Sequence, residues 1–143
     1  MIGKGLRDME PDKRLIQLRI DIIERNLKEI RDILKLKKMR YRDELALKHA
    51  LLESIEACID IANHIIATKG FRRPTDYKDI FVVLEENKIV PKGLSRKLQE
   101  MAKFRNVLVH RYATVDMNKL VQIAKKDIKD VNRFLNIIIK KFL

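Results

Sequence analysis

The stretch DELALKHALLESIEACIDIANHIIATKG, residues 43–70, decides the fold of this chain. Gly70 is the last residue of the stretch, and glycine is common at the position that ends a helix. Inside the stretch, apolar side chains recur every three or four residues, a spacing typical of the seam along which helices pack in a bundle. These positions are Leu45, Leu52, Ile55, Ile59, Ala62 and Ile66. The stretch therefore predicts a long helix from about Asp43 to Lys69.

A second stripe on the same predicted helix is polar, with spacings of three, four and four residues. It consists of Glu53, Glu56, Asp60 and His64. If the stripe faces solvent, it is only the polar side of an amphipathic helix. If it faces another helix or a cleft, it places acidic and hydrogen-bonding groups next to cations. The sequence leaves both interpretations open.

Upstream of this helix, residues 1–10 contain two glycines and no apolar period, so we expect a flexible tail. Pro11 suits the first helical position, and Asp12 in the first turn would complement the helix dipole. A helix to about Lys37 is predicted, followed by a basic connection over residues 34–42. Its apolar stripe would be Leu15, Leu18, Ile22, Leu27, Ile30 and Leu34.

Downstream, Pro74 interrupts the chain, and Thr75 or Asp76 can cap a short helix. Pro91 opens a further helix that reaches about Tyr112, and Asp116 is a predicted N-cap for the last helix. The inward positions are Ile80, Phe81, Leu84, Leu94, Leu98, Met101, Val107 or Leu108, Leu120, Ile123, Ile128, Val131, Phe134 or Leu135, Ile138 and Phe142. We predict an all-α fold: one antiparallel helical bundle over residues 11–143, with three long helices and two shorter ones.

The composition agrees with this fold class, because 46% apolar residues suffice for a core while four glycines and three prolines are few for a sheet with tight turns. The net charge of +12 attracts polyanions, nucleic acid first and anionic membrane second, although a merely solvated, lysine-rich surface fits the same count. The single cysteine, Cys58, excludes an internal disulfide and suits a small core residue. With no leader pattern and no long apolar run, a cytoplasmic protein is expected.

The segment FRNVLVHRY, residues 104–112, carries groups that can handle a phosphate and a proton. On a helix, Arg105 and Tyr112 share one face, whereas His110 lies about 140° around the axis from Arg105. A straight helix therefore does not let this arginine and this histidine hold one small group together. Either the helix loosens before ATVD, residues 113–116, or a second chain supplies the missing partner.

A second chain would complete a chemical set. Cutting RNA without a metal requires a base for the 2′-hydroxyl, an acid for the 5′-oxygen and a cation for the developing phosphorane charge. A twofold dimer offers two histidines and two arginines about one axis. Without further information the pattern is also explained by chance: His110 would complement the dipole at a helix end, and Tyr112 would be a half-buried amphipathic residue.

FRNVLVHRY, preceded by LSRKLQEMAK and followed by ATVD, resembles the signature of the HepT-like branch of the HEPN superfamily. The matching positions are Arg105, Asn106, His110, Tyr112 and Asp116. The segments IEACIDIANHIIATKG and PTDYKDIFVVLEENKIVP are similar to the family's second helix and short third helix, so the resemblance spans about residues 12–142. Lys103 departs from the pattern, because relatives commonly carry glycine there.

The resemblance implies a helical homodimer that acts as a metal-independent ribonuclease toxin of a type VII-like toxin–antitoxin pair. By position, Arg105 would hold the scissile phosphate, His110 would act as base or acid, and Asn106 would orient one of them. A small nucleotidyltransferase antitoxin would adenylylate Tyr112. No cofactor is expected. No metal is expected either, because His49, interpreted as a surface residue, and His64 lack a short ligand spacing.

Other residues are candidates for supporting roles. Asp60, Asn63 and His64 either face Arg105 from the second long helix or serve as hydrogen-bonded structural groups. Lys103 and Arg111 are candidates for binding RNA. Cations in the connections either follow an RNA backbone or are simply solvated: Lys37, Lys38, Arg40, Arg42, Arg72 and Arg73. The alternative function is a non-catalytic module that docks a nucleotidyltransferase; a plain RNA-binding bundle lacks an aromatic stacking platform.

Overall fold

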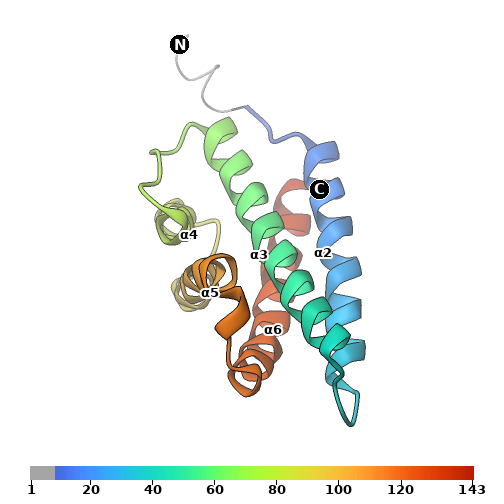
Figure 1. Cartoon of the computed structure of the whole chain (residues 1–143). Helices are drawn as coiled ribbons and strands as arrows, with labels where there is room; N and C mark the ends of the chain where they lie inside the picture. Colours follow the sequence, from blue (N-terminus) through green and yellow to red (C-terminus); the bar gives the residue numbers. More distant parts are fainter. Residues whose placement is uncertain (1–8) are drawn as a thin grey trace, which may run out of the picture.

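The computed structural model describes residues 9–143 and is all-helical over that range. The elements are α2 (Lys13–Leu34), α3 (Tyr41–Lys69), α4 (Tyr77–Glu86), α5 (Lys92–His110), the 3₁₀ turn η1 (Tyr112–Thr114) and α6 (Met117–Phe142) (Figure 1). The prediction of an all-α bundle, with two shorter helices between the second long helix and the last, is confirmed. The predicted tail, residues 1–10, falls mostly outside the described residues; Met9 donates its backbone N–H to the Thr68 carbonyl at 2.9 Å.

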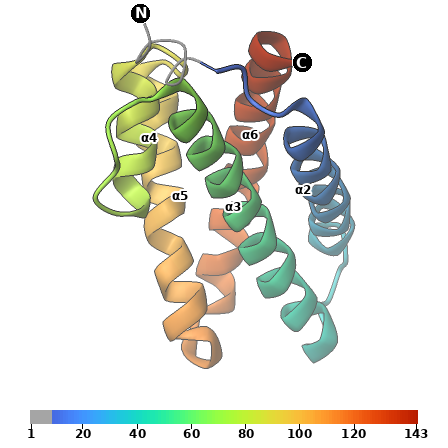
Figure 2. The same ribbon diagram turned by 90° about the horizontal axis from the view of Figure 1, so that it is seen from above.

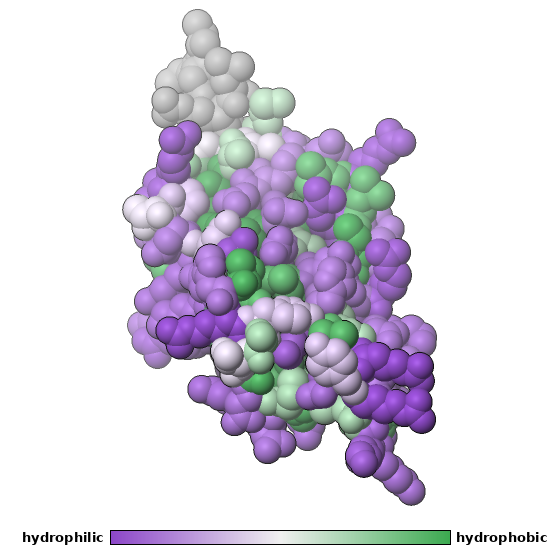
Figure 3. Space-filling model, in the orientation of Figure 1, coloured by the Kyte–Doolittle hydropathy of each residue, from purple (hydrophilic) through white to green (hydrophobic). Residues whose placement is uncertain are grey.

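Helix α3 is the centre of the bundle, because each of the other four α-helices packs against it. Helices α2 and α3 run antiparallel as the most extensive pair, α4 packs on α5, and α6 lies behind α3 (Figures 1 and 2). In the orientation of Figure 1, polar side chains cover most of the visible face, with apolar groups between them (Figure 3). The helices thus enclose a single apolar core beneath a polar surface.

The central position of α3 makes its buried surface wider than one seam. Four of the six predicted seam residues are buried, while Leu45 and Leu52 are half-buried. Additional α3 residues are buried as well, namely Leu47, Leu51, Cys58, Ile61 and Ile65. At the far side of the core, Phe81 of α4 and Phe134 of α6 meet edge to face with ring centroids 5.9 Å apart.

The predicted apolar stripe of α2 is wrong in register. Leu18 is 56% exposed, whereas the buried residues are Ile16, Ile20, Ile23, Leu27, Ile30 and Ile33. The observed set follows the three-four alternation of a bundle seam more closely than the predicted set does, and five of its six members are isoleucine. The stripe is therefore rotated around the helix, with only Leu27 and Ile30 shared.

Helix ends follow the capping chemistry of the sequence, with one correction. Asp12 is the N-cap of α2, where its carboxylate accepts the backbone N–H of Arg14 and Leu15, so Pro11 precedes the cap instead of opening the helix. Asp76 caps α4 and Asp116 caps α6, as predicted. Gly70 ends α3 with φ of 69°, in the left-handed region that favours glycine.

Arg72 holds the connection between α3 and α4. Its guanidinium binds both carboxylate oxygens of Asp79 at 2.7 and 2.8 Å and reaches Glu86 at 2.8 Å. Hydrogen bonds from Arg72 hold the pKa of both carboxyl groups below their usual range. Because this fork is saturated by two carboxylates, Arg72 is a structural clamp and not one of the connection cations that are free to follow an RNA backbone.

No helix within residues 9–143 is long and apolar enough to cross a membrane. Cys58 is buried in the core, as predicted, and burial raises the pKa of its thiol. His49 is exposed, also as predicted.

Asp127 of α6 is a carboxylate inside the bundle. Its Oδ2 atom is buried and has no hydrogen-bond partner among the described residues. Burial raises the pKa of this carboxyl to about 7, with a smaller contribution from the charge of Asp130 and an opposing one from Lys126. The folded chain therefore favours the protonated form of Asp127 over a pH range in which the unfolded chain ionises it.

Asp127→Asn is predicted to remove this pH dependence. Below about pH 4 both states of the wild type hold the proton, whereas between pH 4 and 7 only the folded state keeps it, so wild-type stability falls as the pH rises. The difference in free energy of unfolding between the variant and the wild type should therefore be more favourable to the variant at pH 8 than at pH 4, by on the order of 2–4 kcal/mol. Urea unfolding at both pH values measures this difference. Asp21→Asn, at an exposed position of α2, controls for the loss of one negative charge; an equal gain at both pH values would refute the prediction.

Candidate ribonuclease site

Helix α5 remains regular through His110, and this fixes the geometry of the motif. The Arg111 backbone N–H donates to the Val107 carbonyl at 2.8 Å, and only then does the chain turn into η1. Arg105 and His110 consequently leave the helix axis about 140° apart. The helix does not loosen early enough to bring His110 over to Arg105, so the first of the two arrangements considered from the sequence is not adopted.

The Arg105 side chain is held between α3 and α4 and is only 18% exposed. Its guanidinium carbon lies 4.3 Å from the centre of the Tyr77 ring, a cation–π contact. Its Nε is 4.0 Å from Glu56 Oε1, and its Nη1 donates to Asn106 Oδ1 at 3.4 Å. Three neighbours thus restrict the rotamers of a side chain that would otherwise be mobile.

The polar stripe of α3 divides between two neighbours. Asp60 accepts a hydrogen bond from Arg19 of α2 at 3.1 Å, and His64 Nε2 accepts the backbone N–H of Asp12 at 2.7 Å. Of the two roles considered from the sequence, Asp60 and His64 thus have the hydrogen-bonded structural one, and Glu56 is the α3 residue that lies next to Arg105. On a helix, Asp60 and His64 are rotated about 40° and 80° from Glu56, toward α2. Asn63 is exposed.

Tyr112 packs against the first third of α3. Its hydroxyl donates to the Leu45 carbonyl at 3.4 Å, a long hydrogen bond. The Lys48 ammonium donates to the Tyr112 carbonyl at 2.9 Å and lies 4.8 Å from the centre of the tyrosine ring. Lys48 is only 7% exposed, and no carboxylate within residues 9–143 forms an ion pair with it. A buried ammonium is therefore used to hold the motif tyrosine in place.

The remaining motif groups face solvent. Asn106, His110 and Arg111 are exposed, and Lys103 forms an exposed ion pair with Glu100 at 3.5 Å. Apolar side chains stand among them, Val107 being 36% exposed. No cluster of three or more metal-binding side chains occurs within residues 9–143. The end of α5 thus presents His110 and Arg111 to solvent, while Arg105 is anchored on the other side of the helix.

An all-helical bundle that presents Arg105, Asn106 and His110 near the end of α5, with Tyr112 in the 3₁₀ turn that follows, defines a HEPN-type fold and motif. A family model described as ribonuclease HepT-like matches residues 16–138. The chain belongs to the HepT-like ribonuclease family, and the resemblance inferred from the sequence is confirmed.

Two kinds of relative support this membership. The chain is 34% identical over 83 residues to the mRNA nuclease HepT of Shewanella oneidensis, an alignment that covers 58% of this chain and 62% of that protein. A crystal structure of a toxin–antitoxin with AMP-PNP superposes with a TM-score of 0.84 at 26% identity, covering 90% of this chain and all of the other. The structure of the tri-AMPylated Shewanella oneidensis HEPN toxin in complex with MNT antitoxin superposes with a TM-score of 0.82 at 27% identity. This match covers 91% of this chain and 100% of the other.

Lys48 and Tyr77 were missed in the sequence. Lys48 had a detectable signal, because it lies seven residues before Ile55 and fourteen before Ala62, on the buried stripe of α3. A lysine at such a core position is unusual unless its charge has a partner. Tyr77 is the first residue of the short helix α4, and nothing in its local pattern indicates that its ring contacts Arg105 of the neighbouring helix α5.

Lys48→Met is predicted to loosen the turn that carries Tyr112 without unfolding the bundle. A hydrogen bond from a charged group, worth about 1.5–3 kcal/mol, is lost while the apolar part of the side chain stays. Amide hydrogen exchange of residues 111–115 should accelerate by about tenfold or more, with core amides of α3 unchanged. Lys78→Met, at an exposed position of α4, is the matched control. Unchanged protection of residues 111–115 in the Lys48 variant would show that the contact does not hold the turn.

Proposed function

We propose that the chain is a metal-independent endoribonuclease toxin that cuts RNA at a composite site formed by two copies. The observation that carries the proposal is the divergence of Arg105 and His110 on one regular helix, in a member of a ribonuclease family. One copy cannot direct both groups at the same phosphate. A twofold axis near the end of α5 would place the histidine of each copy opposite the arginine of the other.

In this mechanism one neutral His110 removes the proton of the 2′-hydroxyl, and the oxygen attacks the adjacent phosphorus. The second His110, protonated, gives a proton to the departing 5′-oxygen, leaving a 2′,3′-cyclic phosphate on one fragment and a 5′-hydroxyl on the other. Arg105 stabilises the charge that develops on the phosphorane oxygens. Its contacts with Tyr77 and Glu56 hold it ready, so that less freedom is lost when the phosphate binds.

Regulation by a nucleotidyltransferase partner is part of the proposal. The Shewanella oneidensis HEPN toxin is described as tri-AMPylated and complexed with an MNT antitoxin. In this chain the Tyr112 hydroxyl would attack the α-phosphate of ATP, lose its proton and release pyrophosphate. The long hydrogen bond to the Leu45 carbonyl is weak enough to be given up. An AMP group there would add negative charge two residues from His110 and compete with the substrate phosphate.

His110→Ala is predicted to reduce RNA cleavage in EDTA by about 10²–10⁴-fold, because it removes the acid–base group, while RNA binding persists. Gel analysis of labelled RNA, with detection of the cyclic phosphate, measures the effect. His49→Ala, at an exposed histidine of α3, is the matched control and should cut at the wild-type rate.

The same assay tests the composite site. Mixing Arg105→Ala with His110→Ala chains lets roughly half of the dimers combine one working arginine with one working histidine. Because the second histidine of the mechanism is missing in such a dimer, only part of the activity should return, but more than either variant shows alone. A wild-type chain that sediments as a monomer and still cuts RNA at the full rate would contradict the twofold site. If neither wild type nor variant cuts RNA but both bind a nucleotidyltransferase, the chain is the non-catalytic docking module instead.

Tyr112→Phe is predicted to abolish transfer of AMP from ATP by the partner nucleotidyltransferase, since the accepting oxygen is gone. Intact-mass spectrometry of the chain after incubation with ATP and that enzyme measures the modification. Tyr41→Phe, at an exposed tyrosine of α3, should be modified like the wild type. Equal modification of the Tyr112 variant would place the acceptor elsewhere.

A further inference from the structure

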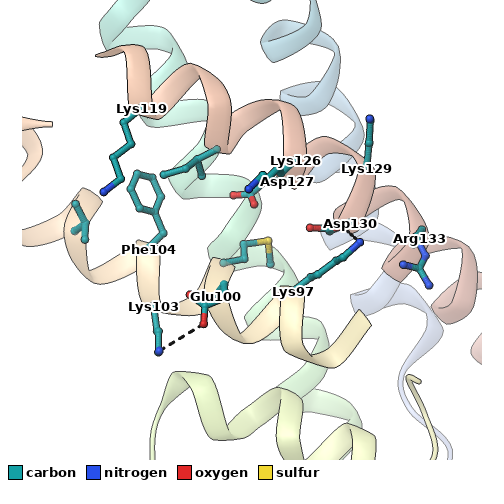
Figure 4. A pocket seen from close by; sticks show the side chains of 13 residues that line it. Lys97, Glu100, Lys103, Phe104, Lys119, Lys126, Asp127, Lys129, Asp130 and Arg133 are labelled. Atoms are coloured by element: carbon teal, nitrogen blue, oxygen red, sulfur yellow. Dashed lines mark hydrogen bonds and ion pairs between the residues drawn. The ribbon is translucent and has the colours of Figure 1, made fainter. Parts of the chain in front are cut away.

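A groove of about 790 Å³ opens between α5 and α6 on the side of α5 away from Arg105. Figure 4 shows its side chains, with Lys119 and Phe104 at one end and Arg133 at the other. The floor is apolar and the rim is rich in cations. The lining residues are Lys97, Glu100, Met101, Lys103, Phe104, Val107, Lys119, Ile123, Lys126, Asp127, Lys129, Asp130 and Arg133.

The cations on the α6 side of the groove form a row. Lys119, Lys126 and Arg133 are each seven residues apart, so they lie on one face of the helix at intervals of about 10 Å. All three are exposed, and no carboxylate within residues 9–143 forms an ion pair with them. Across the groove, Lys97 and Lys103 are partly compensated by Asp130 at 4.0 Å and Glu100 at 3.5 Å. The α6 row therefore carries charge that no ion pair neutralises, although Lys126 and Arg133 lie near enough to Asp130 to oppose the rise that burial causes in its pKa.

The groove adjoins the side of α5 that carries His110. Lys103 lies seven residues before His110 and Val107 three before it, so both share the outward side of α5 with the histidine. Phe104 and Ile123 are half-buried and expose part of their apolar surface to the groove. A cationic track with an apolar floor and one aromatic ring, about one helical turn from His110, fits a nucleic-acid strand whose phosphates meet the rim while a single base contacts Phe104.

We propose that the groove between α5 and α6 binds the single-stranded RNA segment that flanks the scissile phosphate. The inference rests on the proposed function, because RNA is the substrate there. A duplex is far wider than the space between two adjacent helices. A second copy of this chain is a poorer occupant. The groove holds six cations and three carboxylates, so a twofold contact between two grooves would bring two surfaces of net charge +3 together. An RNA backbone supplies the opposite charge along the whole row.

The test measures the salt dependence of binding. The probe is a fluorescent 2′-O-methyl oligoribonucleotide of about twelve nucleotides, which lacks the attacking hydroxyl and is not cut. In the triple variant Lys119→Ala, Lys126→Ala, Arg133→Ala, the fall of log affinity with log salt should become less steep by about 2. This corresponds to roughly 0.7 for each lost phosphate contact. The matched control is Arg14→Ala, Arg25→Ala, Arg31→Ala, at three exposed positions of α2, which contributes nothing to the groove. Its slope should stay near that of the wild type.

The outcomes separate the groove from the proposed activity. If the groove variant loses binding while the wild type binds the probe but cuts no RNA, the groove is supported and the ribonuclease proposal fails. If the wild type cuts RNA and the groove variant binds and cuts as well, with an unchanged slope, the groove proposal is overturned and the ribonuclease proposal stands. A slope lowered equally in the α2 control, or a groove variant that loses only self-association or a protein partner, also overturns the proposal.

Discussion

The bundle depends on the burial of α3, the helix against which all the others pack. A helix in this position is apolar over much of its circumference, and its few polar groups face neighbours at short range. Glu56 faces Arg105 of α5, Asp60 faces Arg19 of α2, and Lys48 reaches the carbonyl of Tyr112. The packing that forms the core therefore also sets the positions of the functional side chains, because the same helix contributes to both.

The positively charged side chains differ in whether they form ion pairs within the chain. Some cations are saturated within the chain, as Arg72 is by Asp79 and Glu86. Others, such as Lys119 and Lys126, stand along a groove without an ion-pair partner in the described part of the chain. Net charge alone does not distinguish a solvated surface from a polyanion-binding one. The distinction comes from where the uncompensated cations lie relative to the His110 end of α5.

Local signals in the sequence predicted the elements well, because capping groups and glycines act on their immediate neighbours. Asp116, Asp76 and Gly70 do what their positions indicated. The register of α2 was misjudged, since Leu18 satisfied a loose spacing while a stricter alternation of isoleucines decided burial. The partners of Arg105 depend on how three helices pack, so the spacing on α3 could not separate Glu56 from Asp60. The contact of Lys48 with Tyr112 joins residues 64 positions apart and is likewise a tertiary property.

Two departures from an ideal core bear on the motif and its surroundings. Lys48 is a buried ammonium and Asp127 a buried carboxylate with an unpartnered oxygen, and each costs stability that an apolar residue would not. Consistency between local preference and global fold is the rule in stable chains, and exceptions concentrate where function constrains the sequence. Lys48 holds the turn that carries Tyr112, and Asp127 lies in the wall of the groove between α5 and α6. Both departures from optimal packing therefore adjoin places for which a function is proposed, the turn that carries Tyr112 and the groove between α5 and α6.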